Sequence, residues 1–273
     1  MAGTQRGTGQ EPSGRGDGPA RLSAIRKILT TTGPMSVKEL SRHLGYSRST
    51  IYRDVSQLQS HREVVLARGL IVPQRSVATE IPPKVRARVN WEAKRAMCEK
   101  ALELISPDMT IILDDSSSVM PLLDMLHTRV PLTVITNSHV VAQHLEDVAG
   151  IQIYLLGGLY YTWLSSCHGA MTVNALRHIE ADMALFSTVG MTARGLTNPY
   201  EYTAQTKVAM MQAAETSVVL MDHSKFGRRT MYSIASLEDI PILITDEEPQ
   251  GEPSAAELAA AGVETLIGRP PER

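Results

Sequence analysis

Apolar residues near the start of the chain recur every three or four positions, as they do on one face of a helix: Leu22, Ile25 and Leu29. This spacing predicts a first helix over residues 20–30, which Gly33-Pro34 stops. A short second helix is expected after Ser36, because Ser36 and Glu39 have the spacing of a capping box. Gly45 ends that second helix.

A third helix is predicted over residues 48–59, with Ser47 as its N-cap. One face of this helix carries the apolar side chains Ile51, Val55 and Leu58. The advance of about 100° per residue places polar side chains on the opposite, solvent-facing side: Ser49, Tyr52, Arg53 and Ser56. Two short strands over residues 64–66 and 70–73, with a turn near Gly69, are then expected to form a wing.

Two short helices joined by a glycine turn, the second exposing polar side chains, are typical of a helix-turn-helix that places its second helix in the major groove of DNA. The side chains predicted to contact DNA lie on that helix and on the wing: Arg48, Ser49, Thr50, Tyr52, Arg53 and Arg68. The pattern also fits a three-helix domain with a hairpin that binds another protein, and this alternative stays open here.

From residue 91 the pattern changes to short β-branched strands that alternate with helices. Strands are predicted over residues 110–114, 132–137, 151–156, 183–189, 217–222 and 241–246. Helices are predicted over residues 91–105, 119–126, 138–148, 172–179 and 204–215. This alternation favours an α/β domain with a parallel or mixed sheet. The predicted parts are a disordered tail (1–19), a winged helix-turn-helix domain (20–73), a linker (74–90) and the α/β domain (91–268).

The net charge of −2 conceals a difference between the two parts of the chain. Residues 1–90 carry 15 Lys and Arg against 6 Asp and Glu, whereas residues 91–273 carry 12 against 23. A basic surface binds polyanions by releasing their condensed counterions, so a double-stranded DNA partner belongs at the N-terminal end. The two cysteines, Cys98 and Cys167, have no zinc-ligand spacing, and no hydrophobic signal region or membrane span is visible. We therefore expect a cytoplasmic protein without a metal or cofactor.

Polar residues gather where the predicted strands of the α/β domain end. In open α/β sheets this is where ligands bind, because loops and helix N-termini offer backbone donors there. Serines after the first strand suit an anion such as phosphate, the glycine pair after the third permits a close backbone approach, and Lys225 supplies a cation. The candidate effector-binding residues are Asp114, Ser116, Ser117, Ser118, Thr136, Asn137, Ser138, Gly157, Gly158, Glu201, Lys207, Asp222 and Lys225.

These residues make the chain resemble the DeoR family of bacterial transcriptional repressors from about Arg21 to Asp246. The motifs that carry the resemblance are Ser47–Asp54, Leu113-Asp114, Val134–Ser138, Leu156-Gly157-Gly158, His168-Gly169-Ala170, Gly195-Leu196-Thr197, Glu201, Lys207 and Asp222–Gly227. The chain departs from the family where Tyr52 replaces the usual arginine and where Ser116 replaces the usual glycine of the phosphate loop. It departs again where Leu70 follows Gly69 in place of a glycine pair.

The resemblance implies a sensor domain with a fold similar to ribose-5-phosphate isomerases, binding phosphorylated sugars in a homodimer or homotetramer. The function that follows is a DNA-binding repressor of carbohydrate-metabolism genes, gated by a sugar phosphate. An alternative is an isomerase-like enzyme with an appended DNA-binding domain, in which Glu201 is the base and Lys207 or Lys225 stabilises an enediolate. A third possibility is that the sensor fold serves only assembly.

Overall fold

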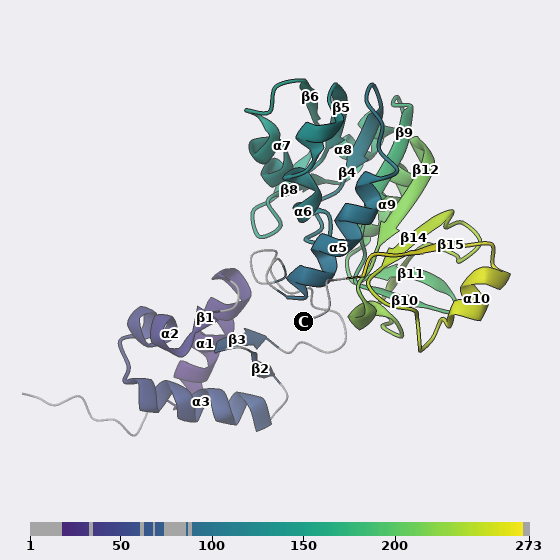
Figure 1. Cartoon of the computed structure of the whole chain (residues 1–273). Helices are drawn as coiled ribbons and strands as arrows, with labels where there is room; N and C mark the ends of the chain where they lie inside the picture. The colour runs from purple at the N-terminus through teal and green to yellow at the C-terminus, as the bar shows by residue number, and fades with distance from the viewer. Residues whose placement is uncertain are drawn as a thin grey trace, which may run out of the picture. The chain divides into compact units, whose positions relative to one another are not determined.

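The computed structural model describes residues 18–32, 35–60, 63–67, 69–73, 86 and 89–269. The chain divides into two compact units between Arg75 and Ser76, and each has a hydrophobic core of its own. Figure 1 shows the N-terminal unit in purple to blue and the C-terminal unit in blue, teal, green and yellow. Four predictions fall outside the described residues: most of the tail 1–19, most of the linker 74–90, the helix stop at Gly33-Pro34 and the wing residue Arg68.

The described N-terminal unit contains the helices α1 (Gly18–Thr32), α2 (Val37–Leu44) and α3 (Arg48–Ser60). The predicted capping box is present, because the Glu39 N–H donates to Ser36 Oγ over 3.2 Å and the Ser36 N–H donates to the Glu39 carboxylate over 2.8 Å. Gly45 ends α2 with a φ of 72°, a left-handed conformation that glycine adopts at low cost. Ser47 caps α3, since the Thr50 N–H donates to its Oγ over 3.2 Å.

A small antiparallel sheet completes this unit, in the order β1 (Met35–Ser36), β3 (Leu70–Pro73), β2 (Val64–Ala67). The predicted hairpin turns at Gly69, whose φ is 81°. Strand β1 was not predicted, because two residues are too short to show an alternating pattern. The sheet and helices enclose one core, which includes Ile25, Leu40, Ile51, Leu58 and Ile71. The apolar face of α3 is thereby buried and its polar face is left outside.

Among the described residues of the C-terminal unit, seven parallel strands form one sheet in the order β15-β14-β12-β9-β4-β5-β6. Their bounds are β4 (Thr110–Leu113), β5 (Leu132–Thr136), β6 (Ile151–Leu155), β9 (Ala181–Phe186), β12 (Ala214–Leu220), β14 (Ile242–Thr245) and β15 (Glu264–Ile267). The six predicted strands correspond to six of these, and the α/β class is confirmed.

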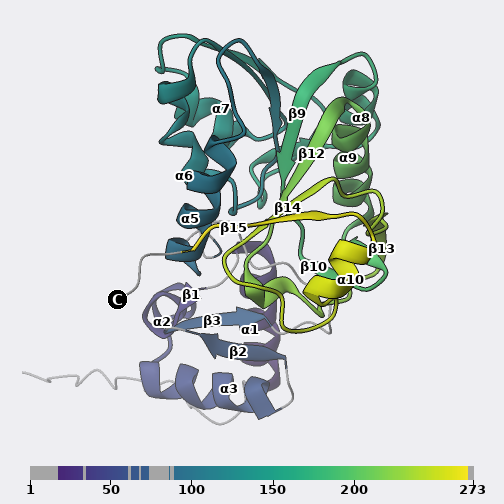
Figure 2. The same ribbon diagram turned by 45° about the vertical axis from the view of Figure 1, so that its right-hand side comes forward.

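Helices cover both faces of the sheet, because neighbouring residues of a strand point to opposite faces. One layer comprises α5 (Trp91–Leu102), α6 (Met120–Leu123) and α7 (His139–Leu145), and the other α8 (Ala170–Leu176), α9 (Glu201–Gln212) and α10 (Ala255–Ala260). Ile111 and Leu113 pack under the first layer, and Ile112 packs under the second. Figure 2 shows the two layers on either side of β9 and β12. Within the described ranges, every helix is too short or too polar to cross a membrane.

Several short elements of the C-terminal unit were not predicted. They are the edge strand β15 and the helix α10, the hairpin β7 (Leu159–Tyr161) and β8 (Ser166–His168), the sheet of β10 (Gly190–Thr192), β11 (Gly195–Asn198) and β13 (Tyr232–Ala235), and the 3-10 helices η1 (Leu126–Arg129) and η2 (His223–Lys225). Strands of three or four residues show too little alternation to be recognised. The helix predicted over 119–126 is divided, since α6 ends at Leu123 and η1 follows.

A test of this packing concerns the pair Arg21–Asp54, which joins α1 to α3. The Asp54 side chain is buried, and the Arg21 guanidinium donates two hydrogen bonds to its carboxylate. Arg21→Ala leaves a buried carboxylate without its charged donors, so we expect the free energy of unfolding of the N-terminal unit to fall by about 1–3 kcal/mol. Hydrogen exchange of α1 and α3 in the full chain measures this loss.

The matched control is Arg26→Ala, because Arg26 pairs with Glu63 at side-chain exposures of 45% and 32%. Solvent screens such a pair, and its removal should cost less than about 1 kcal/mol. Equal losses in the two variants would contradict the role given to Asp54.

Candidate DNA-binding helix and effector-binding cluster

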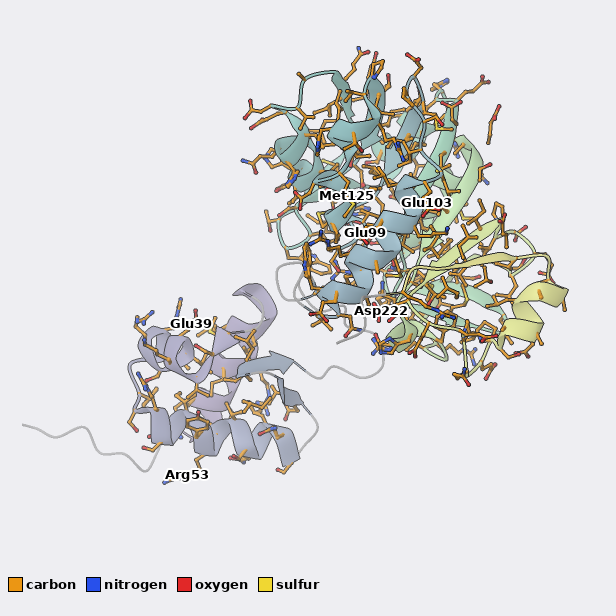
Figure 3. The ribbon with its side chains drawn as sticks, in the orientation of Figure 1. Glu39, Arg53, Glu99, Glu103, Met125 and Asp222 are labelled. Carbon is orange, nitrogen blue, oxygen red and sulfur yellow. The ribbon has the colours of Figure 1, made fainter. Side chains whose placement is uncertain are left out.

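The side of α3 that faces away from the core is polar. The exposed residues there are Arg48, Ser49, Tyr52, Arg53 and Ser56. Figure 3 shows Arg53 on the outer side of α3, pointing away from the unit, and the Tyr52 side chain is 53% exposed. The hydroxyls of Ser49 and Thr50 lie 2.9 and 2.8 Å from Ser47 Oγ, so both take part in the N-terminal cap of the helix.

Buried polar residues follow the C-terminal ends of four neighbouring parallel strands, β12, β9, β4 and β5. We define the polar cluster as these residues together with the side chains that contact them: Lys94, Asp114, Asp115, Ser116, Ser117, Ser118, Thr136, Asn137, Ser138, Ser166, His168, Ser187, Lys207, Asp222 and Lys225. Because parallel strands end at the same edge of a sheet, the fold brings together loops that lie far apart in the sequence.

Lys225 connects three of these strand ends. It lies in η2, after β12, and its Nζ donates to Ser118 Oγ over 2.9 Å and to Ser187 Oγ over 2.6 Å. Burial lowers the pKa of Lys225 to about 7, although the nearby Asp222 opposes the shift. An anion placed beside this amine would stabilise its charged form.

Two further lysines reach the polar cluster from helices. Lys94 of α5 is buried, and its Nζ donates to Ser117 Oγ over 3.1 Å and to the Arg86 carbonyl oxygen over 2.5 Å. Burial lowers the pKa of Lys94 to about 8. Lys207 of α9 is paired with the Asp114 carboxylate, and both side chains are buried. Asp114 also accepts hydrogen bonds from the backbone N–H groups of Ser116 and Ser187, over 3.0 and 3.3 Å.

A second chain of polar contacts runs through Asp115. Ser166 Oγ donates to Asp115 Oδ2 over 2.6 Å and lies 2.9 Å from His168 Nε2, while His168 Nδ1 lies 3.1 Å from Thr206 Oγ1. Burial alone would raise the pKa of Asp115, but the hydrogen bond from His168 and the charge of Lys207 hold it well below its usual range. The rings of Tyr161 and Tyr202 pack against His168, with centroids 5.7 and 5.3 Å away.

Two atoms of the polar cluster lack a hydrogen-bond partner among the described residues. They are Ser116 Oγ and Asn137 Oδ1, both buried. The other end of the Asn137 amide is fixed, because its Nδ2 donates to the Cys167 carbonyl oxygen over 2.9 Å. Buried polar atoms are nearly always satisfied, so these two atoms mark a place where a bound molecule could supply the partner.

Other predicted residues serve local structure. Thr136 Oγ1 accepts from the Ser138 N–H, and Ser138 Oγ caps α7 at Val141. Gly158 is needed for packing inside the chain, because a Cβ there would lie 2.2 Å from Thr172 Oγ1 and 2.8 Å from the His168 carbonyl oxygen. The Gly157 carbonyl oxygen accepts from the same Thr172 hydroxyl over 2.9 Å. The close approach at the glycine pair is therefore made by α8.

Glu201 does not join the polar cluster. It is exposed at the start of α9, accepts a hydrogen bond from Gln205 over 3.3 Å and lines a groove between α8 and α9. Lys207 follows six residues later, about 240° around the helix, and points inward instead. The structure does not place this carboxylate beside Lys207 and Lys225 as an enolising base would require.

Sequence reasoning missed several members of the polar cluster as site residues: Lys94, Asp115, Ser166, His168 and Ser187. One usable signal was present for Lys94, which shares the apolar helix face of Met97, Cys98 and Ala101. Ser166 and His168 lie on the short strand β8, which leaves no readable pattern.

Comparison with known proteins gives the family. Residues 89–247 match the DeoR C terminal sensor domain, and residues 21–69 match an HTH domain. The chain belongs to the DeoR family. Within that family it is 33% identical over 249 residues to the HTH-type transcriptional repressor GlcR of Bacillus subtilis, covering 90% of this chain and 95% of GlcR.

Two other HTH-type transcriptional regulators are similar to this chain over most of their length. The HTH-type transcriptional regulator GolR of Listeria innocua is 33% identical, with 84% of this chain and 90% of GolR covered. The regulator GlpR of Haloferax volcanii is 29% identical, with 91% and 97% covered. Among solved structures, ribose 5-phosphate isomerase A of Methanocaldococcus jannaschii is 18% identical, with a TM-score of 0.37 and coverage of 51% of this chain and 56% of the enzyme.

The relatives of this DeoR-family chain are transcriptional regulators and not enzymes. The chain is accordingly a transcriptional regulator, and the alternative of an isomerase-like enzyme is set aside. The exposed position of Glu201 agrees with that assignment.

The lysines of the polar cluster predict a pH dependence of stability. Their pKa values in the folded chain, about 8 for Lys94 and about 7 for Lys225, lie below the ordinary 10.5. The unfolded chain therefore binds more protons between about pH 7 and pH 10, so the contribution of these lysines to stability rises with pH there. Lys225→Met should reduce the rise in unfolding free energy between pH 7 and pH 9 by on the order of 1–2 kcal/mol.

Chemical denaturation of the full chain at pH 7, 8 and 9 measures that slope. The control is Lys100→Met, because Lys100 lies on the surface of α5 and pairs with the exposed Glu103. A wild-type slope in Lys225→Met would show that the amine of Lys225 is not held partly neutral by the fold.

Proposed function

We propose that this DeoR-family regulator is a sequence-specific repressor of carbohydrate-metabolism genes. We further propose that a phosphorylated sugar controls its affinity for a DNA operator. The effector half of the proposal depends on one observation, the combination of the half-buried Lys225 and the buried Lys94 with two unsatisfied oxygen atoms in the polar cluster. The DNA half depends on the exposed polar face of α3. The cytoplasm, where DNA and sugar phosphates are both accessible, is the expected location.

The lysines support an anionic ligand. Lys225 and Lys94 donate to the hydroxyls of Ser118, Ser187 and Ser117, and those hydroxyls could turn toward a phosphate while the ammonium groups supply charge. Ser116 Oγ has a proton to donate and no acceptor among the described residues. A phosphate group satisfies both needs, because its oxygens accept several hydrogen bonds at once.

Asn137 indicates what the rest of the ligand carries. Its Oδ1 can only accept a hydrogen bond, and a phosphate dianion has no proton to donate. A second part of the ligand must therefore bear a donor, for which a sugar hydroxyl is the simplest group. A molecule that combines an anion with hydroxyls meets the requirements of both ends of the polar cluster.

The N-terminal unit supports the DNA half. Tyr52 and Arg53 are exposed side by side on α3 and have no structural partner in the core, and residues 1–90 carry an excess of basic residues. Arginine and tyrosine side chains on an outward-facing helix can contact base edges and phosphates. The relative GlcR is a transcriptional repressor, which supports repression rather than activation of transcription by this chain.

The first test of this proposal replaces Tyr52 and Arg53 together by alanine. The probe is the duplex that the full-length wild type enriches from a random-sequence DNA pool. Each base-edge contact contributes about 1–3 kcal/mol, so we expect an affinity loss of roughly 30-fold or more by fluorescence anisotropy. Arg95→Ala is the control, since Arg95 is an exposed helix arginine of the C-terminal unit that pairs with Glu99. Unchanged affinity in the double variant would overturn the assignment of α3.

The second test compares sugar phosphates with their parent sugars in thermal-shift titrations of the full chain. Wild type should be stabilised more by the phosphorylated form, because Lys225 and the serines form charge-assisted hydrogen bonds with phosphate. Lys225→Ala should lose this preference by about tenfold in affinity, which corresponds to one such hydrogen bond.

A companion variant separates the two ends of the polar cluster. Asn137→Leu should weaken binding of a sugar phosphate and of its parent sugar by the same factor, because it removes the acceptor for a hydroxyl and leaves the lysines in place. Lys100→Ala serves as the surface control. If no sugar phosphate stabilises wild type more than its parent sugar, the effector half of the proposal fails.

A further inference from the structure

Strand β6 forms one edge of the seven-stranded sheet and lies beside β5 (Figure 1). Among the described residues, β6 pairs with β5 only. An edge strand presents unpaired N–H and C=O groups, and proteins usually protect such edges with charged residues or proline. The opposite edge, β15, begins with the charged Glu264, whereas β6 has no such protection.

The segment that contains β6 is uncharged over an unusual length. No Lys, Arg, Asp or Glu occurs between Asp147 and Arg177. In contrast, residues 91–273 as a whole carry 12 basic against 23 acidic residues, so two copies of this unit have the same net charge and repel each other on average. This segment is where two copies can approach with the least electrostatic cost.

The same edge is apolar and exposed. Ten large apolar side chains are exposed within the described residues, and six of them lie on β6, α7, β7 or α8: Val140, Tyr154, Leu155, Leu159, Tyr160 and Met171. We name these six residues the β6 edge patch. Helix α7 packs on β6 and on β8, α8 also packs on β8, and β7 pairs with β8. The Tyr160 ring lies against the His139 ring at 6.4 Å, so the segments that carry the patch are linked to one another through α7 and β8. Exposed apolar patches of this kind mark interaction sites.

The backbone of β6 is oriented for pairing with another strand. The Leu156 N–H donates to the Thr136 carbonyl oxygen of β5 over 2.8 Å. Since backbone groups alternate in direction along a strand, Ile153 and Leu155 direct theirs away from β5, toward the open edge. A strand added there would satisfy them.

We propose that β6 pairs in antiparallel fashion with β6 of a second copy of this chain, about a two-fold axis near Ile153, to form the dimer. Such a contact is isologous, so an uncharged strand meets its own copy without like-charge repulsion. The choice of a second copy as the occupant rests in part on the proposed function, because a helix-turn-helix that reads a symmetric operator needs two copies of its recognition helix.

The test introduces charge at Tyr154, whose side chain is 52% exposed. In the proposed pair, Tyr154 of each copy is a diagonal neighbour of the other, within reach of a long side chain. Tyr154→Lys and Tyr154→Asp should each raise the dissociation constant of the pair by about tenfold or more, because like charges then meet. Sedimentation velocity of the full chain over a dilution series, without DNA or sugar, measures this change.

An equimolar mixture of the two variants should recover association to within about threefold of wild type, because opposite charges then face each other across the axis. Met231→Lys is the matched control, since Met231 is 76% exposed and lies outside the β6 edge patch. The proposal is overturned if wild type is a monomer, if the single variants associate as wild type does, or if the mixture does not recover. Because neither DNA nor effector is present, a failure of operator or sugar-phosphate binding leaves this result unaffected.

Discussion

The C-terminal unit depends on the pairing of charges that its fold buries at the strand ends. Lys207 extends from α9 to Asp114 at the end of β4, and neither side chain is exposed. A buried ion without its partner costs about 3–5 kcal/mol, so helix and strand must keep this arrangement. Because Asp114 also accepts the N–H groups of Ser116 and Ser187, one carboxylate fixes the loops after β4 and β9.

Not every charge in the polar cluster is compensated as fully as that pair. Burial lowers the pKa of Lys225 and Lys94, because removing their charged ammonium groups from water costs free energy. Such a cost is common at binding sites, where a ligand supplies the missing countercharge. The absence of Glu201 from the polar cluster distinguishes this arrangement from that of an enolising enzyme, in which a carboxylate must approach the substrate.

The two units differ in how their charged residues are distributed. The N-terminal unit buries one acid, Asp54, against Arg21 and leaves the basic Arg48 and Arg53 exposed on α3. The C-terminal unit has an acidic excess, but residues 148–176, which include β6, carry no Lys, Arg, Asp or Glu. DNA binding and self-association would then use surfaces of opposite character, one basic and one neutral and apolar.

The sequence by itself determined the elements whose signals are local. The capping box at Ser36, the turn at Gly45, the polar face of α3 and six strands of the large sheet follow from spacing and side-chain chemistry within a few residues. Only the tertiary structure decided which distant residues meet, so it brought Lys94, Ser166 and His168 into the polar cluster and kept Glu201 out. It also decided that β6 is an edge strand. These outcomes depend on strand order and on the direction of each side chain, which are set by packing between segments remote in sequence. Such packing produces no periodic pattern of hydrophobic residues along the chain.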